Sequence, residues 1–290
     1  MSYGARVVLD SISEAGDRLT TIEATFPRIV LAEFNTHRVF SRNSASSRAI
    51  PILKQLTRLE EDPYIPTYWG KNQSGMQARE ELEGEARAQA IEVWMEAAED
   101  AMRHAKRLLD LDVHKQITNR LLEPFMWHTV IVTATEWSNF FALRRDPDAD
   151  PAIQGIANMM YDAMQASTPQ LLKKGEWHLP LIQPDELEWA TANLELAKKV
   201  STGRCARTSY LTHNGSRDHD ADIELYERLV SNGHMSPPEH VATPHYEEPS
   251  MNDFGEPSGY ESLWSGNFRG WKQFRKTLPN ESDFSLVRTP

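Results

Sequence analysis

The longest periodic pattern in the sequence constrains the fold most strongly, and it occupies residues 77–111. Apolar side chains recur there at spacings of three and four residues, a pattern that places them on one face of an α-helix. The segment therefore predicts one long amphipathic helix or two helices in line. Its apolar positions are Ile91, Trp94, Ala98, Met102, Ala105 and Leu109.

Short β-branched runs predict strands on either side of this helical segment. "RVVLDS" and "RLTTIEATF" are typical of two strands joined by a turn at Gly16. "WHTVIVTAT" fits either a strand or a buried helix, because periodicity does not separate the two for a short apolar run. Most other patterned segments are helical, so we expect an α+β protein in which helix dominates.

Composition excludes several classes of protein. The 290-residue chain is 40% hydrophobic and carries a formal net charge of −11, which disfavours binding to duplex DNA. Cys205 is the only cysteine, so neither an internal disulfide nor a cysteine-based zinc site can form within one chain. His234 and His240 have poor spacing for a metal, and we expect none. The sequence shows neither a signal-peptide pattern nor an apolar run long enough to span a membrane, so we expect a cytoplasmic protein.

Residues 35–51, "NTHRVFSRNSASSRAIP", combine arginine, histidine, asparagine and serine side chains in one short segment, which is called the motif segment below. Arg38, Arg42 and Arg48 repel one another unless anions neutralise them, and phosphate pairs well with guanidinium groups. The alternative is a solvated loop whose arginines pair with the chain's own carboxylates. Neither GxGxxG nor GxxxxGK[ST] occurs, so a conventional Rossmann flavin or nicotinamide site is not supported.

The spacing within the motif segment resembles the signature of flavin-dependent thymidylate synthases, R-H-R-x-x-S-x-N-x-x-S-x-R. The matching residues are His37, Arg38, Ser41, Asn43, Ser46 and Arg48, and Thr36 replaces the first arginine. "NRLLEP", "SNFFALR", "CARTSY" and "NGHMSPPEH" resemble further elements of that family. The last two normally precede the arginine signature and here follow it, so the sequence resembles a circular permutation of the family.

The resemblance implies a helix-rich α+β fold with a central antiparallel sheet, circularly permuted. It implies a single catalytic domain over residues 1–290, with residues 1–240 matching family elements and 241–290 forming a C-terminal extension. The family forms homotetramers whose sites are built from several subunits, and we expect the same here.

The resemblance also implies the reaction, which is reductive methylation of dUMP to dTMP with methylenetetrahydrofolate, FAD and NADPH. Glu33 stands where the family usually has glutamine, so a related C5 methylase or hydroxymethylase acting on dCMP or another pyrimidine nucleotide is the alternative. A second alternative is a non-enzymatic nucleic-acid-binding protein, which the acidic charge disfavours.

Matching positions carry the implied site residues. Arg144 is the implied catalytic residue, holding the ionised pyrimidine. The implied nucleotide contacts are Glu33, Ser44, Ser46, Ser47, Arg48, Arg120 and Arg144. The implied FAD contacts are His37, Arg38, Asn43, Asn139, Ser209, Ser236 and Glu239. Asp148 and the shortened link 133–138 depart from the family pattern near the flavin.

The segment "GNFRGWKQFRK" combines basic and aromatic side chains near the C-terminus. Arg269, Trp271 and Arg275 are candidate contacts for a phosphate or for folate. The alternative for this segment is an amphipathic helix that docks on the core.

Overall fold

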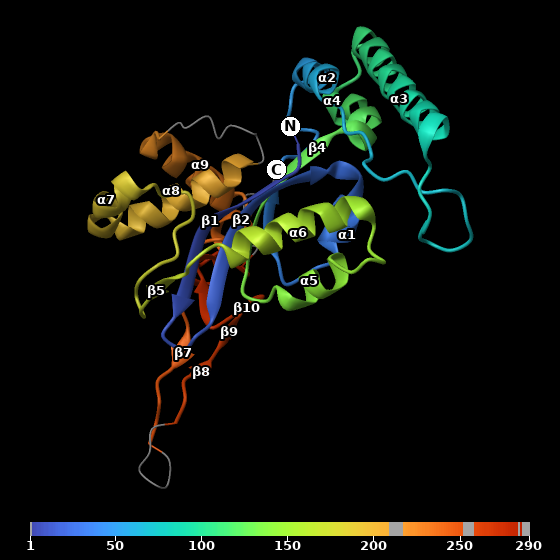
Figure 1. Cartoon of the computed structure of the whole chain (residues 1–290). Helices are drawn as coiled ribbons and strands as arrows, with labels where there is room; N and C mark the ends of the chain where they lie inside the picture. Colours follow the sequence, from blue (N-terminus) through green and yellow to red (C-terminus); the bar gives the residue numbers. More distant parts are fainter. Residues whose placement is uncertain (1, 209–216, 252–257, 284, 286–290) are drawn as a thin grey trace.

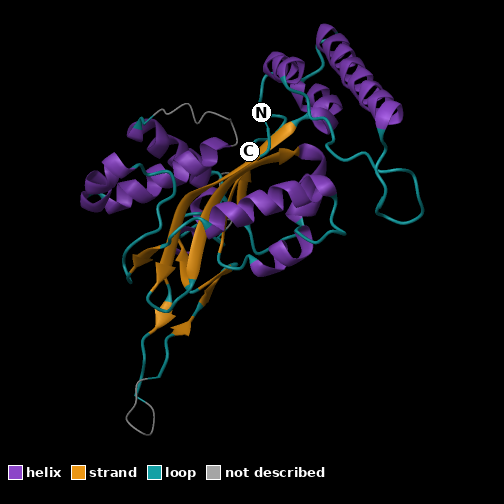
Figure 2. Cartoon of the chain, in the orientation of Figure 1, coloured by secondary structure: helices purple, strands orange, loops and turns teal. Residues whose placement is uncertain are grey.

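The computed structural model describes residues 2–208, 217–251, 258–283 and 285. A five-stranded sheet of order β3-β4-β2-β1-β5 lies at the centre of the chain (Figures 1 and 2). The strands are β1 Gly4–Ser13, β2 Arg18–Pro27, β3 Ser41–Ser44, β4 Trp127–Ala134 and β5 Gln170–Leu172. Together with the helices this confirms the predicted α+β class.

The sheet is mixed, which refines the antiparallel sheet that we expected. The pairs β1–β2, β2–β4 and β3–β4 are antiparallel, whereas β5 pairs parallel with β1. β1 and β2 form the predicted hairpin, and Gly16 takes the left-handed φ of 86° that its turn requires. "WHTVIVTAT" is the strand β4, which β2 and β3 flank, and residues 130–134 of this strand are buried.

Helices cover both faces of the sheet. Their bounds are α1 Leu31–Asn35, α2 Ile52–Glu61, α3 Gly84–Asp110, α4 Lys115–Thr118, α5 Ser138–Arg144, α6 Pro151–Gln165, α7 Leu187–Ala192, α8 Leu194–Arg207 and α9 His219–Ser231. On one face α6 packs Ile153 and Ile156 against Ile22 and Val132. On the other face, Cys205 of α8 packs in the core against Ile131.

The predicted long helix is the single continuous α3, which begins at Gly84 rather than at Gln77. Figure 1 shows α3 extending away from the sheet beside α2. Only Ala98 and Ala105 of α3 are fully buried, where they pack with Leu56 and Leu59 of α2. No helix within the described ranges is long and apolar enough to cross a membrane.

The motif segment is not all loop, because residues 41–44 form the edge strand β3. Asn43 pairs with Ile131 and Ser44 with Val130 of β4. The local residue pattern is polar and carries no strand signal, so pairing with the buried strand β4 overrides it.

The basic-aromatic segment forms strands rather than the helix considered as an alternative. β10 (Phe268–Arg269) and β11 (Trp271–Gln273) are followed by the short 3-10 helix Phe274–Thr277. β11 pairs with β6 (Ala242–Pro244). Gly266 and Gly270 have φ of 62° and 72°, which end a helix but suit tight turns between strands.

Candidate functional site

A pocket of about 470 Å³ brings the motif segment against the "NGHMSPPEH" element, and we call it the motif pocket. Its volume lies in the range of small-molecule sites. Ser46 and Arg48 come from the motif segment, and His234 and Ser236 come from the second element, which lies far away in the sequence. The full lining is Asn43, Ser46, Arg48, Ala49, His114, Gln116, Ala206, Leu229, His234, Ser236 and Pro237.

Gly233 places the second element at this pocket. α9 ends at Ser231, and Gly233 takes a φ of 77°, which is typical of a glycine that ends a helix. The His234 amide then donates to the Leu229 carbonyl at 2.9 Å, which turns the chain back across the helix end. His234 and Ser236 thereby reach the motif pocket, and Pro237 begins the short 3-10 helix Pro237–Glu239.

Asn43 is anchored by a buried chain of hydrogen bonds that crosses the sheet. Nε2 of His240 lies 3.0 Å from the Asn43 amide, and its Nδ1 lies 2.7 Å from Oγ1 of Thr133. The Thr133 hydroxyl lies 2.7 Å from the Thr21 hydroxyl, which in turn lies 2.8 Å from Nε2 of His178. With its amide nitrogen towards His240, Asn43 also lies 3.3 Å from the Ser236 carbonyl oxygen. The two sequence elements are therefore joined at Asn43.

Burial keeps the imidazoles in this chain neutral. His178 and His240 have no exposed surface, and burial lowers the pKa of each to about 3. A neutral imidazole donates through one nitrogen and accepts through the other, so each can join two hydroxyl or amide partners.

A second cluster surrounds Arg144 at the end of α5. Its Nε donates to Nε2 of His37 at 3.0 Å, and its Nη2 donates to Oγ1 of Thr36 at 3.0 Å and to the Glu33 carbonyl at 3.3 Å. The structure thus brings together three implied site residues, Arg144, His37 and Glu33, with Thr36 in the place of the family's arginine.

The second cluster combines the Arg144 cation with a neutral imidazole and an unpaired carboxylate oxygen. Burial and then the cations Arg144 and Arg42 lower the pKa of His37 to about 4, so the ring is neutral at pH 7. A hydrogen bond with Asn139 acts in the opposite direction. Oε2 of Glu33 is buried and accepts no hydrogen bond from any described residue.

Ser47 and Arg120 meet a carboxylate of the protein itself. The hydroxyl of Ser47 donates to Oε1 of Glu123 at 2.6 Å, and Nη1 of Arg120 lies 3.7 Å from the same oxygen. Arg28 pairs with that oxygen at 3.2 Å. These contacts hold the motif segment against the 3-10 helix Asn119–Phe125.

The other implied residues are dispersed. Arg38 is exposed, and Ser44 lies in β3 beside the motif pocket lining. Arg275 pairs with Glu239, and Arg269 lies 3.8 Å from Asp17. Ser209 lies outside the described residues.

Trp271 is not available to a ligand, which corrects our expectation for its ring. It has no exposed surface and packs with Leu19 and Phe268 in a core cluster. Its indole nitrogen donates to the Asp17 carbonyl at 3.1 Å, so its polar atom is also used within the protein.

Three lining residues escaped the sequence analysis, namely His114, Gln116 and Leu229, whereas Ala206 belongs to the quoted "CARTSY" element. His114 caps the short helix α4, where its Nδ1 accepts from the Gln116 amide at 3.3 Å. Neither residue belongs to a recognisable motif, and only the fold brings α4, α8 and α9 to the pocket.

Comparison with known proteins gives one family match. The family described as thymidylate synthase complementing protein matches residues 19–170. Among solved structures, the UMP/dUMP methylase PolB from Streptomyces cacaoi bound with 5-Br UMP is similar, with a TM-score of 0.46 and 18% identity over 57% of this chain and 89% of that chain. The same methylase bound with 5-Br dUMP has a TM-score of 0.44 and 15% identity, over 56% of this chain and 90% of that one. The comparison with curated proteins gave no match.

Proposed function

The chain belongs to the thymidylate synthase complementing protein family, and from this premise we propose that it methylates a pyrimidine nucleotide at C5. The simplest reaction is conversion of dUMP to dTMP, with methylenetetrahydrofolate as carbon donor, FAD as cofactor and NADPH as reductant. The observation that carries the proposal is the contact of Asn43 with both His240 and Ser236. It joins the two signature elements of the flavin-dependent enzymes around one pocket.

Circular permutation is part of the proposal. The family match covers residues 19–170 without interruption, and the "NGHMSPPEH" element follows it in the sequence. In the fold that element nevertheless packs on β3 and β4 of the matched region through His240. A permuted chain needs this arrangement, because the contacts of an element must survive its transfer to the other end.

The motif pocket fits part of a flavin or another nucleotide. Arg48 offers a guanidinium for phosphate, and Asn43, Ser46 and Ser236 offer hydrogen-bonding groups, while Leu229 gives an apolar wall. Reduced flavin, when bound, supplies the hydride that turns the transferred one-carbon unit into a methyl group. The chain's own residues bind and orient the nucleotide and exclude water.

The Arg144 cluster has the chemistry to hold an ionised pyrimidine ring. A guanidinium beside the ring stabilises negative charge there, and His37 and Thr36 fix the direction in which Arg144 points. Arg144, His37 and Glu33 do not appear among the described residues that line the motif pocket. We therefore place the complete site between copies of the chain, with one copy contributing the motif pocket and another the Arg144 cluster, in a homotetramer.

The test is spectroscopic first and catalytic second. Purified protein with added FAD is expected to show bound-flavin absorbance, and tritium is expected to be released from [5-³H]dUMP with folate and NADPH. Protein that binds no FAD at any concentration contradicts the proposal. Cross-linking and mass measurement of the assembly test the shared site, since a strictly monomeric active enzyme excludes it.

A dCMP-directed enzyme is the second candidate, and Glu33 favours it. The buried Oε2 of Glu33 accepts no hydrogen bond from the described residues, and the 4-amino group of cytosine is a donor. Product masses obtained with dCMP and with dUMP separate the two candidates. If dCMP is the substrate, Glu33→Gln is expected to shift the preference towards dUMP, because an amide can also donate to the uracil carbonyl.

A further inference from the structure

A second pocket, of about 220 Å³, lies on the opposite side of the motif segment from the motif pocket, and we call it the rear pocket. Ser46 and Arg48 line the motif pocket, whereas Ala45, Ser47 and Ile50 line the rear pocket. The motif segment is therefore a wall between two pockets. Of the implied nucleotide contacts, Ser47 alone is among the described residues that line the rear pocket.

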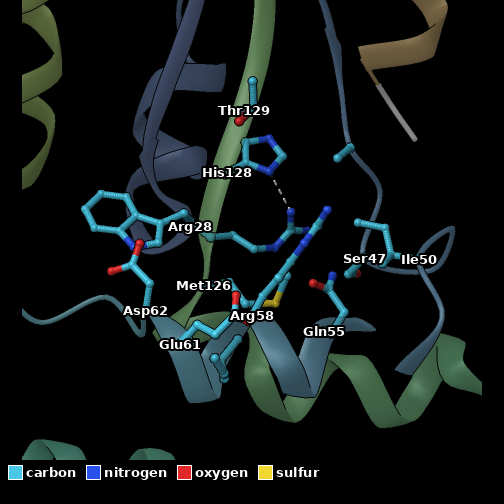
Figure 3. A pocket seen from close by; sticks show the side chains of 13 residues that line it. Arg28, Ser47, Ile50, Gln55, Arg58, Glu61, Asp62, Met126, His128 and Thr129 are labelled. Atoms are coloured by element: carbon cyan, nitrogen blue, oxygen red, sulfur yellow. Dashed lines mark hydrogen bonds between the residues drawn. The ribbon is translucent and has the colours of Figure 1, made fainter. Parts of the chain in front are cut away.

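The rear pocket is built around basic and amide side chains. Arg28 comes from the 3-10 helix Arg28–Val30, Gln55 and Arg58 from α2, and His128 from β4. In the view of Figure 3 the two guanidinium groups lie between Gln55 on the right and Asp62 on the left. His128 stands above them and is joined to Arg28 by a hydrogen bond.

His128 presents an unused N–H group to this pocket. It is only 2% exposed, and its Nδ1 lies 3.0 Å from Nη1 of Arg28. Because arginine can only donate, Nδ1 is the acceptor. Burial and the Arg28 charge lower the pKa of His128 to about 3, so the neutral ring carries its proton on Nε2. That N–H finds no acceptor among the described residues.

Two further donors that line the rear pocket also lack an acceptor among the described residues. Gln55 is 1% exposed and its Nε2 has no partner among the described residues. Nε of Arg28 also has none. Buried polar groups in folded proteins are nearly always paired, so three unpaired donors lining one pocket call for an acceptor from outside.

The charges indicate which acceptor fits. Arg28 and Arg58 bring two guanidinium groups, although Nη2 of Arg28 already pairs with Glu123 and only its Nε is left without a partner among the described residues. Burial lowers the pKa of Arg58, which a bound anion would reverse. Glu61 and Asp62 also line the pocket, and they lie away from Gln55 in Figure 3. An anion is therefore favoured on the side of Gln55 and His128.

We propose that the rear pocket binds an oxyanion group, phosphate or carboxylate, through Gln55, Arg58, His128 and Nε of Arg28. Such a group offers only acceptors to a lining that offers unpaired donors, and guanidinium groups pair with either oxyanion. Its occupant would press on Ala45 and Ser47, directly behind the residues that line the motif pocket.

The test uses full-length protein free of flavin and nucleotide, titrated calorimetrically with inorganic phosphate and, separately, with glutarate. Two matched pairs of variants distinguish the pockets. Arg58→Met and Gln55→Leu alter the rear pocket, and Arg48→Met and Gln116→Leu make the same changes in the motif pocket. Tighter binding of phosphate identifies a phosphate ligand, and tighter binding of glutarate identifies a carboxylate.

We expect a saturable site that survives Arg48→Met and Gln116→Leu. Arg58→Met and Gln55→Leu should each weaken it about tenfold or more, the usual effect of losing a hydrogen bond to a charged group. The inference is overturned if neither probe binds saturably, or if the rear-pocket variants bind as the wild type does. It is also overturned if Arg48→Met abolishes all binding.

Arg58 lies partly at the surface, so its variant folds even if Gln55→Leu does not. Because the assay needs no catalysis, its result is independent of the proposed methylation.

Discussion

Arg144 donates a hydrogen bond of 3.0 Å to His37, which ties the end of α5 to the start of the motif segment. The two residues lie far apart in the sequence and belong to two different elements of the family signature. Their contact sets the orientation of the guanidinium, and the Arg144 charge adds to burial in lowering the pKa of the imidazole.

Arg144→Met should therefore impair the proposed reaction and change the titration of His37. We expect kcat/KM to fall about 10²- to 10³-fold, as for the loss of one charge-stabilising group. The pKa of His37 should rise from about 4, because one of the cations that lower it is removed. Kinetics and NMR titration of the imidazole measure the two effects.

Arg145→Met is the matched control, since Arg145 lies over the Tyr161 ring at 3.6 Å and takes no part in the Arg144 cluster. It should leave both measurements close to wild type. An unchanged His37 titration in Arg144→Met would show that the contact is absent in solution.

Thr133→Val should destabilise the protein by about 3 kcal/mol. The change preserves shape but removes the hydroxyl between Thr21 and His240, leaving both buried partners without it. Urea unfolding measures the loss.

Thr129→Val on the same strand is the matched control. It removes one partly buried hydrogen bond to Thr25 and should lower the free energy of unfolding by about 1 kcal/mol or less. Equal losses in the two variants would argue against a continuous polar chain across the sheet.

Gly203→Ala should be destabilising although alanine favours helices. A Cβ at Gly203 of α8 would lie 2.3 Å from the backbone oxygen of Asp222 in α9, so the two helices would have to separate. We expect a loss of about 1–3 kcal/mol in unfolding free energy.

Gly155→Ala in α6 is the matched control. A Cβ at Gly155 would lie 3.5 Å from its nearest neighbour, an atom of the Tyr3 ring, so this change should be neutral or up to about 1 kcal/mol stabilising. Thermal and urea unfolding of the pair test the close approach of α8 and α9.

Stability should fall as the pH decreases below 6.5. The pKa of His128, His178 and His240 is lowered to about 3 in the fold, whereas an unfolded chain protonates them near 6.5. The unfolded state then binds more protons than the folded state. Each histidine therefore lowers the free energy of unfolding by up to about 2 kcal/mol between pH 7 and pH 5. Urea unfolding at the two pH values measures the total.

A variant isolates one contribution to this pH dependence. His240→Gln should lower stability at both pH values but reduce the difference between them by up to about 2 kcal/mol. His104→Gln, at an exposed position on α3, is the control and should leave the difference as in wild type. A wild-type stability that does not change from pH 7 to pH 5 would mean that these histidines are not held neutral.

The sequence by itself determined the local elements and the family. The turn at Gly16, the long helix α3 and the helix end at Gly233 all follow from short-range rules of periodicity and backbone conformation. The motif spacing identified the family, because fixed intervals between hydrogen-bonding residues are preserved in one chain whatever the order of its segments.

Tertiary structure alone decided where these elements meet. "WHTVIVTAT" became a strand, and residues 41–44 joined it, because sheet pairing depends on partners distant in the sequence. The basic-aromatic segment became strands that bury Trp271, for the same reason. Alternate residues of the motif segment face two different pockets, and the donors of Gln55 and His128 converge behind it. No local pattern encodes these contacts, since they arise only when the packed core brings α2, β3 and β4 together.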